Sequence, residues 1–264
     1  MKNWTTLKIR RAKGAQKLAC LTAADFTMAR LLDAAGVPLV LAGDSLATTM
    51  LGYTNTLPVT MEQMLHHTAA VARGATSALV VADMPFMSYQ ASEDDAVRNA
   101  GRFLKEAGAD AVKIEGGAFR APLVRRLTQN GIPVLGHIGL TPQAVNEIGG
   151  YRVQGRTAPE AEALLADAKA LEAAGVFAMV VECVPVELAE RITREVSVPT
   201  IGIGAGPHCD GQILVLSDFL GMTESPPKLA KAYLNLNGLI RDALARYVEE
   251  VAQGAFPAEG QCYK

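Results

Sequence analysis

The sequence predicts a (β/α)8 TIM barrel followed by additional C-terminal helices. Three observations lead to this fold. Short apolar runs alternate with helical patterns along most of the 264 residues. The apolar runs are continuous, as in parallel strands that are covered on both faces. There are eight of them, and eight βα units in a chain of this length favour a closed barrel over an open doubly wound sheet. We expect one domain over residues 1–264, because no linker, low-complexity segment or repeat interrupts the pattern.

Each element follows from the local pattern. The segment 92–108 illustrates a helix, since Ser92 can cap its start, acids occupy its first turn and Gly108 ends it. The connection 206–211 is too short for a full helix. The strands are expected within residues 18–26, 37–45, 77–86, 110–117, 132–140, 177–185, 198–206 and 212–219. The helices between them are expected at 27–36, 61–74, 92–108, 121–131, 158–175 and 186–196, and further helical stretches run from about Lys228 to Gln253.

Composition and charge restrict the class of function. Half of the residues are apolar, a fifth are charged, and the formal net charge is −2. This balance offers no general attraction to nucleic acid or to anionic membranes. The four cysteines show no CxxC or zinc-type spacing, so we expect reduced thiols. The basic start lacks the apolar core of a signal peptide, and no apolar run is long enough to span a bilayer. A cytoplasmic, soluble enzyme acting on small molecules is therefore expected.

Polar side chains occur where the predicted strands end. Lys113 and Glu115 are two residues apart on one strand, so they point to the same side. In a barrel, the carboxyl ends of all strands meet at one mouth, where active sites of this fold lie. Three carboxylates brought together there require a cation, and Mg²⁺ is favoured over zinc because the cysteines lie elsewhere. The polar residues at these ends are Asp44, Ser45, Asp83, Lys113, Glu115, His137 and Glu182.

Each of these residues also has a structural interpretation. Asp44 could cap a helix, and Asp83, before Met84 and Pro85, could belong to a turn. Glu182 could cap the helix that follows it. Lys113 and Glu115 could form a simple ion pair. These alternatives weaken when all the strands are considered together, because several strands would have to end in unrelated polar residues.

Other chemically reactive side chains are expected to be structural. His66 and His67 lie in the middle of a helix, and at least one of them should pack or face solvent. Cys183 has no base nearby in the sequence, so an inert thiol is favoured over a nucleophile. His208 lies in a loop and receives no role.

Nine motifs, in this order along the chain, resemble those of the ketopantoate hydroxymethyltransferase (3-methyl-2-oxobutanoate hydroxymethyltransferase) family. They are LVLAGDSL, TLPVTMEQM, ADMPF, VKIEGG, GHIGLTPQ, GGYRVQGR, ECVPVELA, IGIGAG and DGQILV. The resemblance covers nearly the whole chain. Three departures from the family pattern are Ala23 in place of tyrosine, Ala47 after GDSL, and the turn GPHC before DGQ.

The resemblance implies a reaction, a fold and site residues. The family transfers a hydroxymethyl group from 5,10-methylenetetrahydrofolate to 3-methyl-2-oxobutanoate, giving 2-dehydropantoate and tetrahydrofolate through a Mg²⁺-stabilised enolate, in the biosynthesis of pantothenate. It implies a (β/α)8 barrel, Mg²⁺ and assembly as a homodecamer. Glu182 is then the expected proton acceptor. The expected metal-site residues are Asp44, Asp83 and Glu115, and the expected substrate-binding residues are Asp44, Ser45, Asp83, Lys113 and His137.

Two other functions are compatible with such a mouth. One is a metal-dependent lyase or aldolase for 2-oxo acids, although the sequence lacks a cysteine-centred lyase loop of the KKCGH type. The other is a barrel that binds an oxo acid and regulates without turnover. That alternative leaves the combination of a candidate base, a lysine and three metal-type acids without an explanation.

Overall fold

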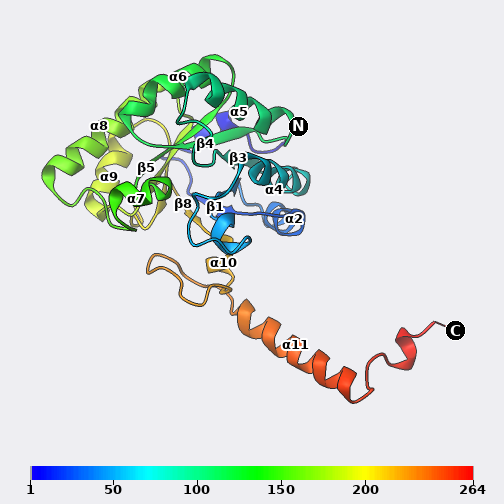
Figure 1. Ribbon diagram of the computed structural model, residues 1–264. Coiled ribbons are helices and arrows are strands. Elements are labelled where there is room, and N and C mark those ends of the chain that lie inside the picture. Colours follow the sequence, from blue (N-terminus) through cyan, green and yellow to red (C-terminus); the bar gives the residue numbers. More distant parts are fainter. Residues whose placement is uncertain (1, 264) are drawn as a thin grey trace. The chain divides into compact units, whose positions relative to one another are not determined.

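Eight parallel strands close into a barrel in which each strand pairs with its neighbours in the sequence and β8 pairs with β1 (Figure 1). The structure is a computed structural model that describes residues 2–263. The predicted (β/α)8 fold is confirmed. The strands are β1 Leu18–Thr22, β2 Leu39–Ala42, β3 Leu79–Asp83, β4 Ala111–Glu115, β5 Val134–Gly139, β6 Ala178–Glu182, β7 Thr200–Ile203 and β8 Gly211–Leu214.

Helices connect most of the strands and surround the barrel (Figure 1). Their starts follow capping chemistry: Ser92 accepts a hydrogen bond from Asp95 N at 3.1 Å, and Thr60 and Thr157 form capping boxes. As expected, no helix separates β7 from β8. The helices of the barrel are α1 Thr6–Arg11, α2 Phe26–Ala34, α3 Leu46–Thr49, α4 Met61–Gly74, α5 Glu93–Lys105, α6 Ala121–Gln129, α7 Val145–Ile148, α8 Ala158–Ala174 and α9 Val186–Glu195, with the 3-10 turns η1 Ala118–Arg120 and η2 Pro142–Ala144.

Residues 216–264 form a second compact unit, separate from the unit that comprises residues 1–215. It contains α10 Leu216–Phe219, α11 Leu236–Ala252 and the 3-10 turn η3 Glu259–Gln261. The expected helical stretch from Lys228 is wrong in its first eight residues, because α11 begins only at Leu236, after the cap Asn235. Within residues 2–263, none of the helices is both long and apolar enough to cross a membrane.

Alternate residues of the strands fill the barrel interior. The inward-facing cluster includes Leu79 and Val81 of β3, Leu135 of β5 and Val180 of β6. The same cluster contains Ile9 of α1, so the N-terminal helix closes the amino-terminal end of the barrel. A closed interior of this kind leaves the opposite, carboxyl-terminal end for polar side chains.

Asp210 connects several segments at the closed, amino-terminal end of the barrel through hydrogen bonds. Its Oδ2 accepts hydrogen bonds from Thr200 N and from Lys13 Nζ, both at 2.9 Å, and its Oδ1 accepts one from Gly14 N at 3.2 Å. Burial raises the pKa of this carboxyl, but these donors lower it more, so that its pKa lies below the usual value. The ionised form is thus the one that joins the segment after α1 to β7 and β8.

Replacing Asp210 with Asn should destabilise the protein at neutral pH by about 1–3 kcal/mol, because a charged acceptor for four donors, which include Thr200 Oγ1 at 3.2 Å, is lost. The pKa is lower in the folded state than the unfolded value of about 3.9. This stabilisation is therefore fully present above pH 4 and is lost as the pH falls through the folded pKa. Denaturant unfolding of both proteins between pH 7 and pH 3 measures the difference. Asp242→Asn, at an exposed residue of α11, is the control. A difference that stays constant over this range would contradict the assignment.

Candidate active site

The barrel register brings the predicted polar residues to one place. Inward positions on each strand are two residues apart, so the alternation that places Leu79 and Val81 inside continues to Asp83. The same alternation turns Lys113 and Glu115 of β4 inward. It also turns His137 of β5 and Glu182 of β6 inward. Cross-strand pairing then sets Asp83 beside Lys113 and Glu115 beside His137.

Lys113 lies at the centre of this group. Its Nζ is 2.9 Å from Asp83 Oδ1, 3.6 Å from Glu115 Oε1 and 3.2 Å from His137 Nδ1. The side chains of Lys113 and Asp83 are only 4% and 2% exposed. Burial lowers the pKa of Lys113, but the acids around it raise the pKa more, so it is shifted upward overall. Lys113 is therefore a permanent buried cation.

The carboxylates outnumber this cation. Asp44 N donates a hydrogen bond to Asp83 Oδ2 at 3.2 Å, which brings the two aspartates together. Burial, and then repulsion from Asp83 and Glu115, raises the pKa of Asp44 well above its usual value. Burial also raises the pKa of Asp83, against the lowering effect of Lys113. For Glu115, the effects of Lys113 and His137 exceed that of burial, and its pKa is lowered. The mouth thus brings three carboxylates together around one lysine.

Two buried carboxylate oxygens have unused acceptor capacity. Within residues 2–263, Oδ1 of Asp83 and Oε1 of Glu115 accept no well-directed hydrogen bond, although Lys113 Nζ lies near both. Hard oxygen ligands with spare lone pairs suit Mg²⁺. Within the described residues, no group of three or more acidic, histidine or cysteine side chains is placed to hold a metal ion. Mg²⁺ in proteins is often held by only one or two carboxylates, together with substrate oxygens and water. The donor set thus fits a magnesium ion.

His137 links this group to Glu182. Its Nε2 lies 3.1 Å from Glu182 Oε2, and its Nδ1 lies 3.6 Å from Glu115 Oε1. Burial and Lys113 lower the pKa of His137, but Glu115 and Glu182 raise it more, and the result is a pKa of about 9. Glu182 is 15% exposed, so its carboxylate borders the open side of the mouth.

Two structural interpretations of the polar residues, the helix caps at Glu182 and Asp44, are wrong. Helix α9 begins after Pro185 without a side-chain cap, so Glu182 is not its cap. Asp44 does not cap α3, because the residue in the cap position is Ser45. The side chain of Ser45 makes no capping hydrogen bond either. Ser45 is half-buried beside Asp44, and its hydroxyl makes no hydrogen bond within the described chain.

His67 and Cys183, which were expected to be structural, have surroundings that agree with that expectation. His67 Nδ1 lies 2.7 Å from the carbonyl oxygen of Ala24, which fixes α4 to the end of β1. All four cysteines are free. Burial raises the pKa of the Cys183 thiol to about 11, which keeps it protonated and unreactive near neutral pH.

Sequence reasoning missed Gln143, which connects the acids to one another. Its backbone N donates to Glu115 Oε2 at 3.0 Å, and its Nε2 donates to Asp44 Oδ2 at 3.0 Å and to Met84 O at 2.8 Å. Tyr89 OH donates to Gln143 Oε1 at 2.6 Å and accepts from Glu115 N at 3.3 Å. The available signal was an amide three residues after the end of the GHIGL segment. Its partners lie 28 to 99 residues away along the chain and left no local pattern.

Comparison with known proteins identifies the reaction. A family model described as ketopantoate hydroxymethyltransferase matches residues 3–259. A protein of Syntrophus aciditrophicus (strain SB) named 3-methyl-2-oxobutanoate hydroxymethyltransferase is 56% identical over 252 residues, which cover 95% of this chain and 93% of that protein. A protein of the same name from Geotalea daltonii is 53% identical over 266 residues, which cover 100% of both chains.

Solved structures agree on the fold alone, because their sequences are distant. Phosphonopyruvate hydrolase in complex with oxalate and Mg²⁺ has a TM-score of 0.63 and 14% identity, over 99% of this chain and 93% of that chain. The 2,3-dimethylmalate lyase, a member of the PEP mutase/isocitrate lyase superfamily, has a TM-score of 0.59 and 14% identity, over 98% and 91%. The match over residues 3–259 and the relatives at more than half identity show that this chain belongs to the ketopantoate hydroxymethyltransferase family, an enzyme family of pantothenate biosynthesis.

Proposed function

We propose that the mouth of the barrel carries out the family's hydroxymethyl transfer, with each polar residue in a separate role. The observation that carries the proposal is a single buried lysine among three acids, next to a histidine–glutamate pair that borders solvent. Lys113 faces the carboxylate of 3-methyl-2-oxobutanoate and supplies fixed positive charge in a site with little water. Ser45, with an unused hydroxyl beside Asp44, adds a hydrogen bond to the same substrate.

Asp44, Asp83 and Glu115 would hold Mg²⁺. The unused oxygens of Asp83 and Glu115 support this assignment. When bound, Mg²⁺ would act as a Lewis acid on the oxo acid and stabilise negative charge that develops on its keto oxygen. Gln143 keeps the carboxylates of Asp44 and Glu115 in place through its two donors.

Glu182 would remove the proton from C3 of the oxo acid. Its carboxylate lies on β6, away from the proposed metal residues, and its Oε2 is 3.1 Å from His137 Nε2. Removing this proton leaves an enolate, whose C3 forms a bond with the one-carbon unit of 5,10-methylenetetrahydrofolate. The bonds from this carbon to N5 and N10 break, and water supplies its hydroxyl group. The C3 proton and the remaining water proton end on the two nitrogens, so tetrahydrofolate leaves and 2-dehydropantoate is the product. Lys113 stabilises the anionic state through its charge.

We further propose that the protein works in the cytoplasm as a homo-oligomer, a decamer by family resemblance. Helix α11 has no buried residue, and its exposed apolar side chains include Leu244 and Val248. An apolar helix face of this kind is typical of contact with another protein chain.

Sedimentation velocity should therefore give an oligomer of the wild-type protein, and Leu244→Glu with Val248→Glu should shift it toward smaller species. A monomeric wild-type protein would contradict this part of the proposal.

Removing one proposed metal carboxylate should weaken Mg²⁺ binding. A residue that only supports a metal ligand typically contributes about 10–100-fold to affinity, so Asp83→Asn should cost at least that much. Titration calorimetry with Mg²⁺ in the presence of 3-methyl-2-oxobutanoate measures binding without turnover. Asp242→Asn, outside the mouth, is the matched control. Equal affinity of Asp83→Asn and the wild-type protein would rule out this metal site.

Glu182→Gln should separate catalysis from binding. The amide keeps the shape of the side chain but cannot accept the C3 proton, so kcat should fall by about 10²–10⁴. Exchange of the C3 hydrogen with D₂O, measured by NMR with Mg²⁺ and without folate, should fall in parallel. Calorimetric affinities for the oxo acid and for Mg²⁺ should change little. If Glu182→Gln exchanges this hydrogen at the wild-type rate, another group is the base, and His137→Asn becomes the next variant to assay.

A further inference from the structure

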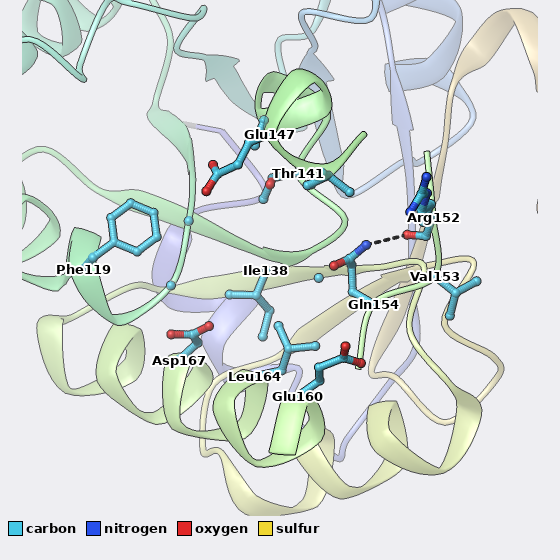
Figure 2. A pocket seen from close by; sticks show the side chains of 15 residues that line it. Phe119, Ile138, Thr141, Glu147, Arg152, Val153, Gln154, Glu160, Leu164 and Asp167 are labelled. Atoms are coloured by element: carbon cyan, nitrogen blue, oxygen red, sulfur yellow. Dashed lines mark hydrogen bonds between the residues drawn. The ribbon is translucent and has the colours of Figure 1, made fainter. Parts of the chain in front are cut away.

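A cavity of about 540 Å³ lies beside the mouth, outside the group of acids around Lys113. Its walls come from the segment after β4, the strand end of β5, α7, the loop at residues 149–156 and the start of α8 (Figure 2). Its volume is in the range of cavities that hold a small-molecule ligand. The mechanism above places the oxo acid at the mouth and leaves this cavity without a function.

The wall of the cavity includes the backbone next to the proposed base. Gly139 pairs with Glu182 in the sheet, and Leu140 N donates to Glu182 O at 2.9 Å. Gln154 N donates to Cys183 O at 2.8 Å. Both Gly139 and Gln154 line the cavity. A Cβ atom on Gly139 would lie 2.2 Å from Glu182 O, and its φ of +91° also favours glycine, so bare backbone is required here. A ligand in the cavity would therefore pass close to β6 where Glu182 lies.

One side of the cavity combines an aromatic ring with a free carboxylate. Phe119 is 72% exposed, and Figure 2 shows it on the same side of the cavity as Glu147. Glu147 has no hydrogen bond or ion pair to any residue between 2 and 263. Asp167, in the same wall, differs because its Oδ1 accepts a hydrogen bond from Ala118 N at 2.7 Å. The carboxylate that remains for a ligand is that of Glu147.

The other side of the cavity carries a free cation. Figure 2 shows Arg152 across the cavity from Phe119, and its guanidinium makes no ion pair within the part of the chain that the structure describes. Another wall acid is Glu160, whose Oε2 accepts from Arg156 N at 2.9 Å and from Thr157 N at 3.1 Å. Glu160 is thus occupied by the start of α8 and does not neutralise Arg152.

We propose that this cavity binds the folate co-substrate, with its pteridine ring between Phe119 and Glu147 and its glutamate tail at Arg152. The pyrimidine part of a reduced pteridine presents an amino group and a ring N–H side by side, which match a carboxylate, and its face stacks on an aromatic ring. The carboxylates of the tail match a guanidinium. The one-carbon unit lies between these two ends of the molecule, which places it at the middle of the cavity, next to the strand that carries Glu182. This inference rests on the proposed hydroxymethyl transfer.

Two ligands and two variants test the two ends of the cavity separately. Calorimetry of the full-length protein with tetrahydrofolate and with 6-methyltetrahydropterin, which lacks the tail, gives four dissociation constants to compare with wild type. Loss of a hydrogen bond to a charged group corresponds to about 10–100-fold in affinity. Glu147→Gln should weaken both ligands by this factor. Arg152→Gln should weaken tetrahydrofolate and leave the pterin unchanged. Both residues are exposed, so folding should tolerate these changes.

Glu190→Gln on α9 and Arg125→Gln on α6 are matched controls, because both side chains are exposed and neither lines the cavity. They should bind both ligands as the wild type does. Unchanged tetrahydrofolate affinity in Glu147→Gln and Arg152→Gln overturns the inference, as does a loss in Arg152→Gln that is equal for both ligands. Failure of the proposed function is a different result: a wild-type protein that binds tetrahydrofolate but neither exchanges the C3 hydrogen of the oxo acid nor forms 2-dehydropantoate.

Discussion

The buried charge of Lys113 is the constraint on which the rest of the site depends. Three carboxylates at the mouth are largely shielded from water, and a buried anion without a partner costs several kcal/mol. One ammonium group within 2.9 Å of Asp83 and 3.6 Å of Glu115 makes their burial tolerable but does not balance all the charge. Burial, and then repulsion from Asp83 and Glu115, raises the pKa of Asp44 well above its usual value. Such a site favours ligands that bring positive charge. Without that charge, the ionised form of these carboxylates is less favourable.

The barrel accounts for the precision of this arrangement. Strand register fixes the distance between neighbouring side chains, and the alternation of inward and outward residues decides which of them face the mouth. A one-residue shift of β4 would move both Lys113 and Glu115 to the outer face. Residues of the loops then hold the side chains of the strands in place. Gln143, in the turn after β5, joins Asp44 to Glu115 and is itself held by Tyr89.

The sequence predicted the strands, their order and the polar residues at their ends, because these depend on local apolar runs and on a rule common to all barrels. It did not predict Gln143 or Tyr89, since their hydrogen bonds join residues from different strands and leave no periodic pattern. The helix expected from Lys228 failed for a local reason. The segment 228–235 has a helix-compatible composition, but the cap that starts α11 is Asn235. The Phe119–Glu147–Arg152 cavity depends on loop conformation, which composition does not specify.

The acids at the two ends of the barrel differ: the one at the closed end stabilises the fold, and those at the mouth serve the function. At the closed end, Asp210 is an acid whose acceptor capacity is used by four donors, and its pKa is lowered. At the mouth, Asp83 Oδ1 and Glu115 Oε1 accept no well-directed hydrogen bond from the residues that the structure describes. A buried acceptor without one costs about 1–3 kcal/mol, which Lys113 Nζ, 2.9 and 3.6 Å from these atoms, reduces. Full burial of one or two large apolar side chains, such as Leu79 and Leu135, offsets a cost of that size. The apolar interior of the barrel stabilises the fold enough to offset the cost of burying the carboxylates at the mouth. Their oxygens therefore need no partner from the protein and stay available to a ligand.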